Sequence, residues 1–147
     1  MNDLAPIAYF TYNRPEHTKI SLEALKKNEL AEFSEIIVFS DGPKNHYDDK
    51  NKVKQVRNIL KELTGFKKKT IINREINYGL YKNFVEGITQ VCNEFNKIIV
   101  LEDDNKPSKY FLNFINDGLD LYQNEQTVCS VNGWFYPQKN KDHSSFQ

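Results

Sequence analysis

The chain has 147 residues, and its 20 Lys and Arg balance its 20 Asp and Glu, so the formal net charge is zero. This length and 39% hydrophobic residues predict one globular domain with a sizeable core. The charge balance argues against binding DNA or an anionic membrane through bulk charge, so no nucleic-acid partner is expected. The longest apolar runs, such as residues 36–39, are far shorter than the roughly 18 to 20 residues that cross a bilayer.

The N-terminus has neither a basic segment nor an apolar stretch, so no secretory signal is expected. The predicted location is the cytoplasm, with a peripheral position at the inner membrane face left open. Cys92 and Cys129 stand alone, without the spacing of a metal or redox motif, and both are predicted to be small core residues.

Short β-branched runs alternate with longer stretches of helical period, and this alternation predicts an α/β sheet. The first predicted strand covers residues 6–12, after which Pro15 suits the first turn of a helix. The second strand, residues 35–40, has the continuous apolar centre of a strand that is covered on both faces. It ends at Asp41-Gly42-Pro43, and the following helix closes at Gly65.

The second half of the chain continues the same alternation. Lys67 to Lys69 are predicted to form a solvated lead-in to the third strand. The further predicted elements are a strand at 70–73, a helix at 80–95, a strand at 97–101, a helix from Pro107 to residue 122 and a fifth strand at 127–131. We expect the domain to cover residues 1–138, followed by a polar tail at 139–147 that lacks periodicity and is a candidate for disorder.

Polar residues follow every predicted strand. Open parallel sheets bind ligands outside the carboxyl ends of their strands, so these positions are the candidates for a site. Loops are polar in most proteins, which makes each residue weak evidence by itself. The candidates are Thr11, Tyr12, Asn13 and Arg14 after the first strand, Asp41 after the second, Arg74 and Asn77 after the third, and Glu102-Asp103-Asp104 after the fourth.

The three consecutive acids directly follow the buried run at residues 98–101. Like charges at a partly buried strand end repel unless a cation compensates for them. Carboxylate oxygens suit Mg²⁺ or Mn²⁺, which often take one or two protein carboxylates and fill their other positions with water and substrate phosphates. The triplet therefore predicts a divalent metal site. No glycine-rich phosphate loop is present, which argues against P-loop and dinucleotide folds.

Four segments together resemble the nucleotide-sugar-binding half of GT-A glycosyltransferases. They are AYFTYNRP at residues 8–15, FSDGP at 39–43, REINYGL at 74–80 and VLEDD at 100–104. Within this class the chain is most similar to bacterial family-2-like sugar transferases and to the N-acetylglucosaminyltransferase I group. The ordered set extends across nearly the whole chain, up to SVNGW at 130–134.

The resemblance implies a three-layer α/β/α sandwich with a mostly parallel sheet, and a nucleotide-diphospho-sugar donor in which uracil fits best as the base. It implies that Thr11, Tyr12 and Arg14 line the nucleotide pocket and that Asp41 accepts a hydrogen bond from the base. Asn77 and Tyr78 are alternatively caps of the third helix. The other implied contacts are Arg74, Asn77 and Gly79 near the ribose and diphosphate, Glu102 or Asp103 at the sugar or ribose, and Asp104 as the ligand of Mn²⁺ or Mg²⁺.

The chain ends sooner than the family pattern, which continues with an acceptor-binding half that usually supplies the catalytic base. We therefore expect a truncated chain that binds a nucleotide sugar weakly without transferring it, a base beyond Gln147, and an unknown glycan, lipid or protein acceptor. Self-association through residues 134–136 is a further expectation. One alternative is a non-catalytic nucleotide-binding or interaction module. A receiver-type signalling domain would need acids where Asn13 and Asn73 stand.

Overall fold

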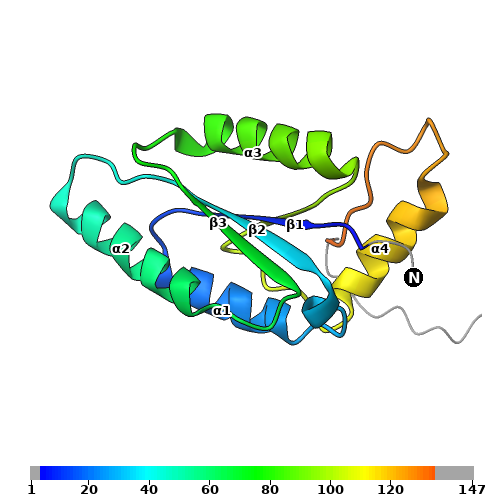
Figure 1. Cartoon of the computed structure of the whole chain (residues 1–147), viewed down its shortest axis with the longest axis horizontal. Coiled ribbons are helices and arrows are strands. Elements are labelled where there is room, and N and C mark those ends of the chain that lie inside the picture. The colour runs from blue at the N-terminus through cyan, green and yellow to red at the C-terminus, as the bar shows by residue number, and fades with distance from the viewer. Residues whose placement is uncertain (1–3, 135–147) are drawn as a thin grey trace, which may run out of the picture.

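The computed structural model describes residues 4–134, which form a parallel sheet with helices on both of its faces (Figure 1). The sheet has four strands in the order β3-β2-β1-β4, so their carboxyl ends share one edge. The strands are β1 (Ile7–Thr11), β2 (Glu35–Ser40), β3 (Lys68–Asn73) and β4 (Ile99–Glu102). The helices are α1 (Pro15–Lys26), the 3₁₀ helix η1 (Ala31–Phe33), α2 (Tyr47–Glu62), α3 (Gly79–Phe95) and α4 (Phe111–Tyr122).

Both faces of the central strands are buried, because successive side chains point to opposite faces and both sets are apolar. Ile7 and Tyr9 of β1 face one cluster, which also contains core residues of α1, α2 and α4. Ala8 and Phe10 face the other cluster, which contains Val91 of α3. In Figure 1, α1 and α2 lie on one side of the sheet and α3 lies on the other. The predicted α/β/α layering and the parallel sheet are confirmed.

Helix α3 approaches the sheet closely over an aromatic stack. The ring of Phe10 stacks on Phe39 and on Phe84, with centroid distances of 5.0 Å and 4.1 Å. Gly87 lies directly above this stack, and a Cβ added to it would come within 2.7 Å of the Phe10 ring. The absence of a side chain at Gly87 therefore lets α3 lie next to the carboxyl-terminal half of β1.

The predicted fifth strand is wrong. Residues 127–131 contain no strand, and the turn bonds from Glu125 N to Tyr122 O and from Val128 N to Glu125 O bend the chain back after α4. Val131 then packs against α4, where it would meet a Cβ on Gly118 at 2.8 Å. Burial against α4 thus replaces pairing with β4, so within residues 4–134 the outer edge of β4 has no neighbouring strand.

Three smaller expectations also need correction. Lys68 and Lys69 belong to β3, and the Lys69 ammonium donates to the carbonyls of Leu60, Lys61 and Leu63 at the end of α2, where a helix favours positive charge. Helix α4 begins at Phe111 and not at Pro107, because Phe111 N first closes a turn onto Ser108 O. Cys129 is exposed, whereas Cys92 is partly buried.

No helix within residues 4–134 is long and apolar enough to cross a membrane. Trp134, the first residue of the predicted self-association patch, is 64% exposed. The other two, Phe135 and Tyr136, lie outside the described residues, as does the predicted tail at 139–147. Self-association stays a prediction.

Gly42 is required where the loop after β2 meets the loop after β3. A Cβ added to Gly42 would lie 2.3 Å from the carbonyl carbon and oxygen of Ile76, and this neighbour is backbone that cannot rotate away. Gly42→Ala should therefore lower the free energy of unfolding by about 2 to 3 kcal/mol through overpacking. Thermal and urea unfolding followed by circular dichroism measure this change.

Gly65→Ala is the matched control. Gly65 has a φ of +90°, and its added Cβ would approach nothing closer than a flexible carbon of Lys26 at 3.5 Å. Only the left-handed backbone then opposes the substitution, at a cost of roughly 1 kcal/mol. Equal losses in the two variants would contradict the close contact at Gly42.

Candidate functional site

A cleft of about 390 Å³ opens at the carboxyl ends of β1, β2 and β4, opposite the first turns of α3. Its lining includes most of the residues predicted to bind a nucleotide, from three separate strand ends and from α3. These are Thr11, Tyr12, Arg14, Asp41, Asn77, Gly79, Glu102 and Asp103. Arg74 and Asp104 lie outside this lining, so the structure brings most of the predicted set together and leaves two members at its margin.

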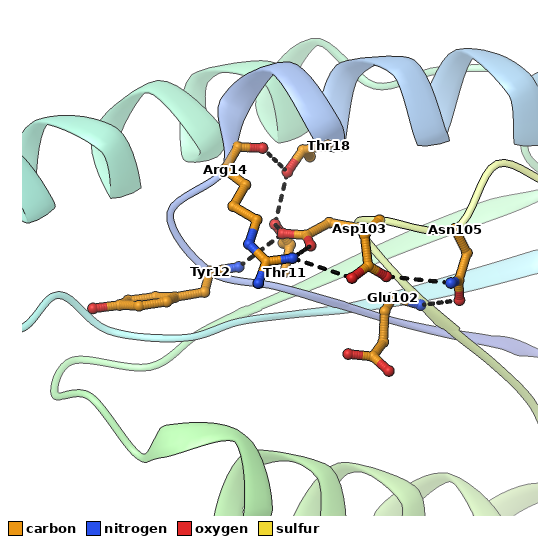
Figure 2. Close-up of polar contacts among 8 residues, drawn as sticks. Thr11, Tyr12, Arg14, Thr18, Glu102, Asp103 and Asn105 are labelled. Carbon is orange, nitrogen blue, oxygen red and sulfur yellow. Dashed lines mark hydrogen bonds and ion pairs between the residues drawn. The ribbon is translucent and has the colours of Figure 1, made fainter.

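The acids after β4 meet the chain after β1 at the rim of the cleft (Figure 2). Arg14 Nη1 lies 3.1 Å from Asp104 Oδ2 and 3.8 Å from Asp103 Oδ1. Asn105 donates to the other Asp104 oxygen at 3.2 Å, and its own side-chain oxygen accepts from Glu102 N. The Asp104 carboxylate is therefore oriented from both sides while its side chain stays 46% exposed.

Asp103 is the buried member of the triplet. Thr11 Oγ1 donates to Asp103 Oδ2 at 3.0 Å, Thr11 and Thr18 share a contact of 2.8 Å, and Thr18 donates to the Arg14 carbonyl at 2.9 Å (Figure 2). Each of these three contacts needs one hydrogen, but the two hydroxyl groups supply only two while Asp103 is ionised. With a proton on Asp103, all three contacts can be hydrogen bonds. Burial, opposed by the Thr11 hydrogen bond, raises the pKa of Asp103, in agreement with this proton count.

Glu102 differs from its two neighbours because its carboxylate points away from Arg14, toward α3 (Figure 2). Among the residues that the structure describes, none forms a hydrogen bond or ion pair with that carboxylate. Burial and the nearby charges of Asp104 and Asp103 raise the pKa of Glu102. No group of three His, Cys, Asp or Glu side chains converges on a common point in residues 4–134. A cation here would need ligands from outside the triplet.

Asp41 connects β2 to the start of α3. Its carboxylate accepts from the backbone amides of Gly42, Tyr78 and Gly79 at 2.8 to 3.0 Å, and from the Asn77 side chain at 3.2 Å. A carboxylate has about four acceptor positions, and four donors already meet this one. Asp41 thus caps α3, and the Asn77 side chain donates to it, whereas Tyr78 contributes only its backbone amide to the cap. The contact of Asp41 with a base stays a prediction.

Arg74 lies behind the cleft wall. Its guanidinium donates to Asn83 at 3.1 Å, pairs with Glu86 at 3.6 Å and lies over the Tyr78 ring. Arg57 of α2 donates to the Arg74 carbonyl at 2.6 Å, which ties the loop after β3 to α2. Arg74 therefore supports α3 and Tyr78, and it reaches the cleft only through Asn83, which lines it.

Sequence reasoning missed a second polar cluster at the cleft. Asp49, in the first turn of α2, accepts hydrogen bonds from the Tyr12 hydroxyl, the Asn13 side chain and the Lys44 amide. Burial, followed by the hydrogen bond to Asp49, raises the pKa of Tyr12 to about 12. An acid just before the apolar positions of a predicted helix indicates a favourable charge at its N-terminus. It does not indicate a partner 37 residues away.

These features define the chain as an α/β domain whose four-stranded parallel sheet matches part of a GT-A fold. The crystal structure of S. aureus TarS, a GT-A glycosyltransferase, is similar over 82% of this chain, with a TM-score of 0.55 and 15% identity. The chain covers 20% of TarS. Similarity at this level of identity shows the fold. No protein-family model matches the sequence, and no curated protein matches it.

The raised pKa of Asp103 predicts how a substitution changes stability with pH. A proton held more tightly in the folded state stabilises it below the ordinary pKa near 4, and this stabilisation is lost as the pH rises through the folded value. Asp103→Asn carries donor hydrogens at every pH. We expect its melting temperature to exceed that of the unmodified protein by about 1 to 3 °C at pH 8, with the gain vanishing near pH 4.

Asp117→Asn, an exposed acid in α4, corrects for the general effect of removing one negative charge. Melting curves of the three proteins between pH 4 and pH 8 give the comparison. A loss at pH 8 would show that an ionised Asp103 suits the Thr11 and Thr18 contacts, and a pH-independent gain would show that the gain does not come from the proton on Asp103.

Proposed function

We propose that this chain is the donor-binding part of a glycosyltransferase that takes its sugar from a nucleotide-diphospho-sugar, with UDP as the favoured carrier. The observation that carries the proposal is the cleft at the carboxyl ends of β1, β2 and β4, where Arg14 meets Asp103 and Asp104. The similarity of the sheet to part of TarS supports this choice. The acceptor, a glycan, lipid or protein, remains unassigned, as does the base that deprotonates it.

Glu102 and Asp104 could each offer an oxygen to a divalent ion, from carboxylates that point to different sides of the strand end. Asp104 is half-exposed at the rim, and the Glu102 carboxylate is free of partners among the described residues. Two hard oxygen ligands are enough for Mg²⁺ or Mn²⁺ when water and phosphate oxygens complete the coordination. When bound, such an ion would stabilise the negative charge that develops on the departing diphosphate.

Arg14 has the exposure needed for a role at the diphosphate. Its side chain is 54% exposed and is held at the rim by Asp103 and Asp104. A diphosphate placed here would exchange one exposed ion pair for another, so the change costs little. The guanidinium also offers the paired donors that suit phosphate oxygens. In this arrangement Arg14 and a cation bound at Asp104 share the negative charge of the donor.

The part of the cleft lined by Thr11, Tyr12 and Gly79, here called the base wall, would hold the base and ribose. The Tyr12 side chain lines the cleft and offers an aromatic surface, with Thr11 beside it. Gly79 has a φ of +74°, and a Cβ added there would meet no atom within 4 Å, so the backbone borders open space. A base N–H that reaches Asp41 would share an oxygen with the amides that this carboxylate already accepts, so an acceptor elsewhere on this wall suits the base better. Arg74 acts on this wall through Asn83 and Tyr78.

Calorimetric titration with UDP, in the absence and presence of Mn²⁺, tests the proposal. We expect Mn²⁺ to raise the affinity for UDP about tenfold or more, because Asp104 and Glu102 would hold the ion where its charge offsets that of the diphosphate. Asp104→Asn should abolish most of this gain and Glu102→Gln should reduce it. Glu32→Gln is the control, because Glu32 is an exposed acid in η1, at the amino-terminal end of β2.

Two results would contradict the proposal. One is that UDP, GDP, dTDP, ADP and CDP all fail to bind with or without the ion. The other is that Asp104→Asn keeps the full effect of Mn²⁺ on binding.

A further inference from the structure

Asp49 is a buried carboxylate beside the cleft that the proposed function does not use. It lies in the first turn of α2 and is 9% exposed. Its three hydrogen-bond donors are the Tyr12 hydroxyl, the Asn13 side-chain amide and the Lys44 backbone amide. All three donor residues line the cleft, whereas Asp49 itself does not. Asp49 is therefore placed to act on the cleft through them.

An ionised carboxylate can only accept hydrogen bonds, and this restricts its partners. Burial alone would raise the pKa of Asp49, but the hydrogen bonds from Tyr12, Asn13 and Lys44 outweigh burial and lower it. Asp49 is thus charged at neutral pH. The Tyr12 hydroxyl must then donate, and Asn13 must turn its NH₂ group toward Asp49. The ring of Tyr12 and the amide of Asn13 are each held in one orientation.

This orientation determines which chemistry remains for a ligand. With Nδ2 of Asn13 committed to Asp49, its Oδ1 is an acceptor that no donor among the described residues meets. The Lys44 ammonium lies 6.0 Å from the centre of the Tyr12 ring and supplies a cationic donor. The wall of Tyr12, Asn13 and Lys44 thus combines an aromatic surface, one acceptor and one donor.

We propose, on the basis of the proposed function, that Asp49 is a positioning residue that makes this wall selective for bases with a ring N–H next to a carbonyl. Uracil, thymine and guanine have this pair on the pairing edge. In this proposal the ring nitrogen of the base lies against the Asn13 oxygen, where adenine and cytosine would present a lone pair in place of a hydrogen. The wrong base thus loses a hydrogen bond to Asn13 and places two acceptors against each other, which lowers its affinity relative to the matching bases.

The test compares Asp49→Asn with Asp48→Asn. Both acids lie in the first turn of α2, so each substitution removes the same charge from the same helix terminus. Asp48 is exposed, so the two variants differ in the contacts made by Asp49. Binding of UDP, dTDP, GDP, ADP, CDP and inorganic pyrophosphate is measured for both, with Mn²⁺ present.

In the unmodified protein we expect UDP, dTDP and GDP to bind more tightly than ADP and CDP. Asp49→Asn should weaken UDP about tenfold and narrow this preference, because the Tyr12 ring and the Asn13 amide lose their fixed orientation. Its affinity for pyrophosphate, which has no base, should stay within about twofold of the unmodified value. Asp48→Asn should leave all the affinities unchanged.

The pKa of Tyr12 reports on its hydrogen bond to Asp49. In Asp49→Asn this pKa should fall below about 12 and stay above its ordinary value near 10, because the burial that contributes most remains, and in Asp48→Asn it should not change. Absorbance titration, with Tyr12→Phe subtracted, isolates this phenol from the other tyrosines. Tyr12→Phe also keeps the ring and removes one Asp49 contact, so it tests the inference if Asp49→Asn fails to fold; its UDP affinity should fall while pyrophosphate is unaffected.

The outcomes separate the two proposals. Failure of every nucleoside diphosphate to bind overturns the proposed function, and this inference with it. If UDP binds but Asp49→Asn and Asp48→Asn have the same nucleotide affinities, the role of Asp49 alone is overturned. Equal affinity for all five nucleotides in the unmodified protein overturns the base selectivity and leaves the donor-binding proposal in place.

Discussion

Negative charge gathers at the carboxyl-terminal edge of the sheet, and the way in which the fold compensates for it determines how the side chains around the cleft are arranged. Three consecutive acids leave β4 at this edge, and the fold treats each of them differently. Asp103 is buried among hydroxyls, Asp104 is paired with Arg14, and Glu102 is left facing the cleft. The repulsion is therefore only partly offset by the protein itself. Burial, with the charge of the neighbouring carboxylates adding to it, raises the pKa of Glu102 and Asp103, and a cation is the natural complement of this charge.

Asp103 and two further carboxylates determine the geometry of the cleft in which a ligand would be bound. Asp41 ties β2 to α3, Asp103 ties β4 to β1, and Asp49 ties α2 to the residues after β1. Each bond joins segments far apart in the chain, and Asp49, as an ionised group that can only accept, also fixes the orientation of its donors. The cleft is thus preorganised by hydrogen bonds to carboxylates at strand ends, next to the two apolar clusters that cover the faces of the sheet.

The layers and the central strands could be predicted because both signals are local. A strand buried on both faces has a continuous apolar run, as β2 does, and α3 shows an apolar face at helical spacing. The fifth strand could not be predicted correctly, since residues 127–131 have strand propensity and only the packing of Val131 on α4 excludes pairing. Lys69 is a similar case, because the three carbonyls at the end of α2 that its ammonium contacts come from another part of the chain.

The candidate site was predictable to the extent that strand ends share one edge. This rule placed Thr11, Arg14 and Glu102 at one cleft. It could not show that Asp41 already accepts four donors, that Arg74 points behind the wall, or that Asp49 belongs to the cluster. Those facts depend on side-chain directions, which follow from tertiary packing and leave no periodic pattern in the sequence.

The absence of a neighbour for β4 within residues 4–134 bears on how copies of the domain behave toward each other. A free strand edge is a template on which another chain can add, and long, flat, apolar edges promote aggregation. Here the edge strand has four residues, and the side chain of Asn105 already occupies the amide of Glu102. A short edge that ends in an occupied amide and a cluster of negative charge gives an incoming strand few hydrogen bonds to form.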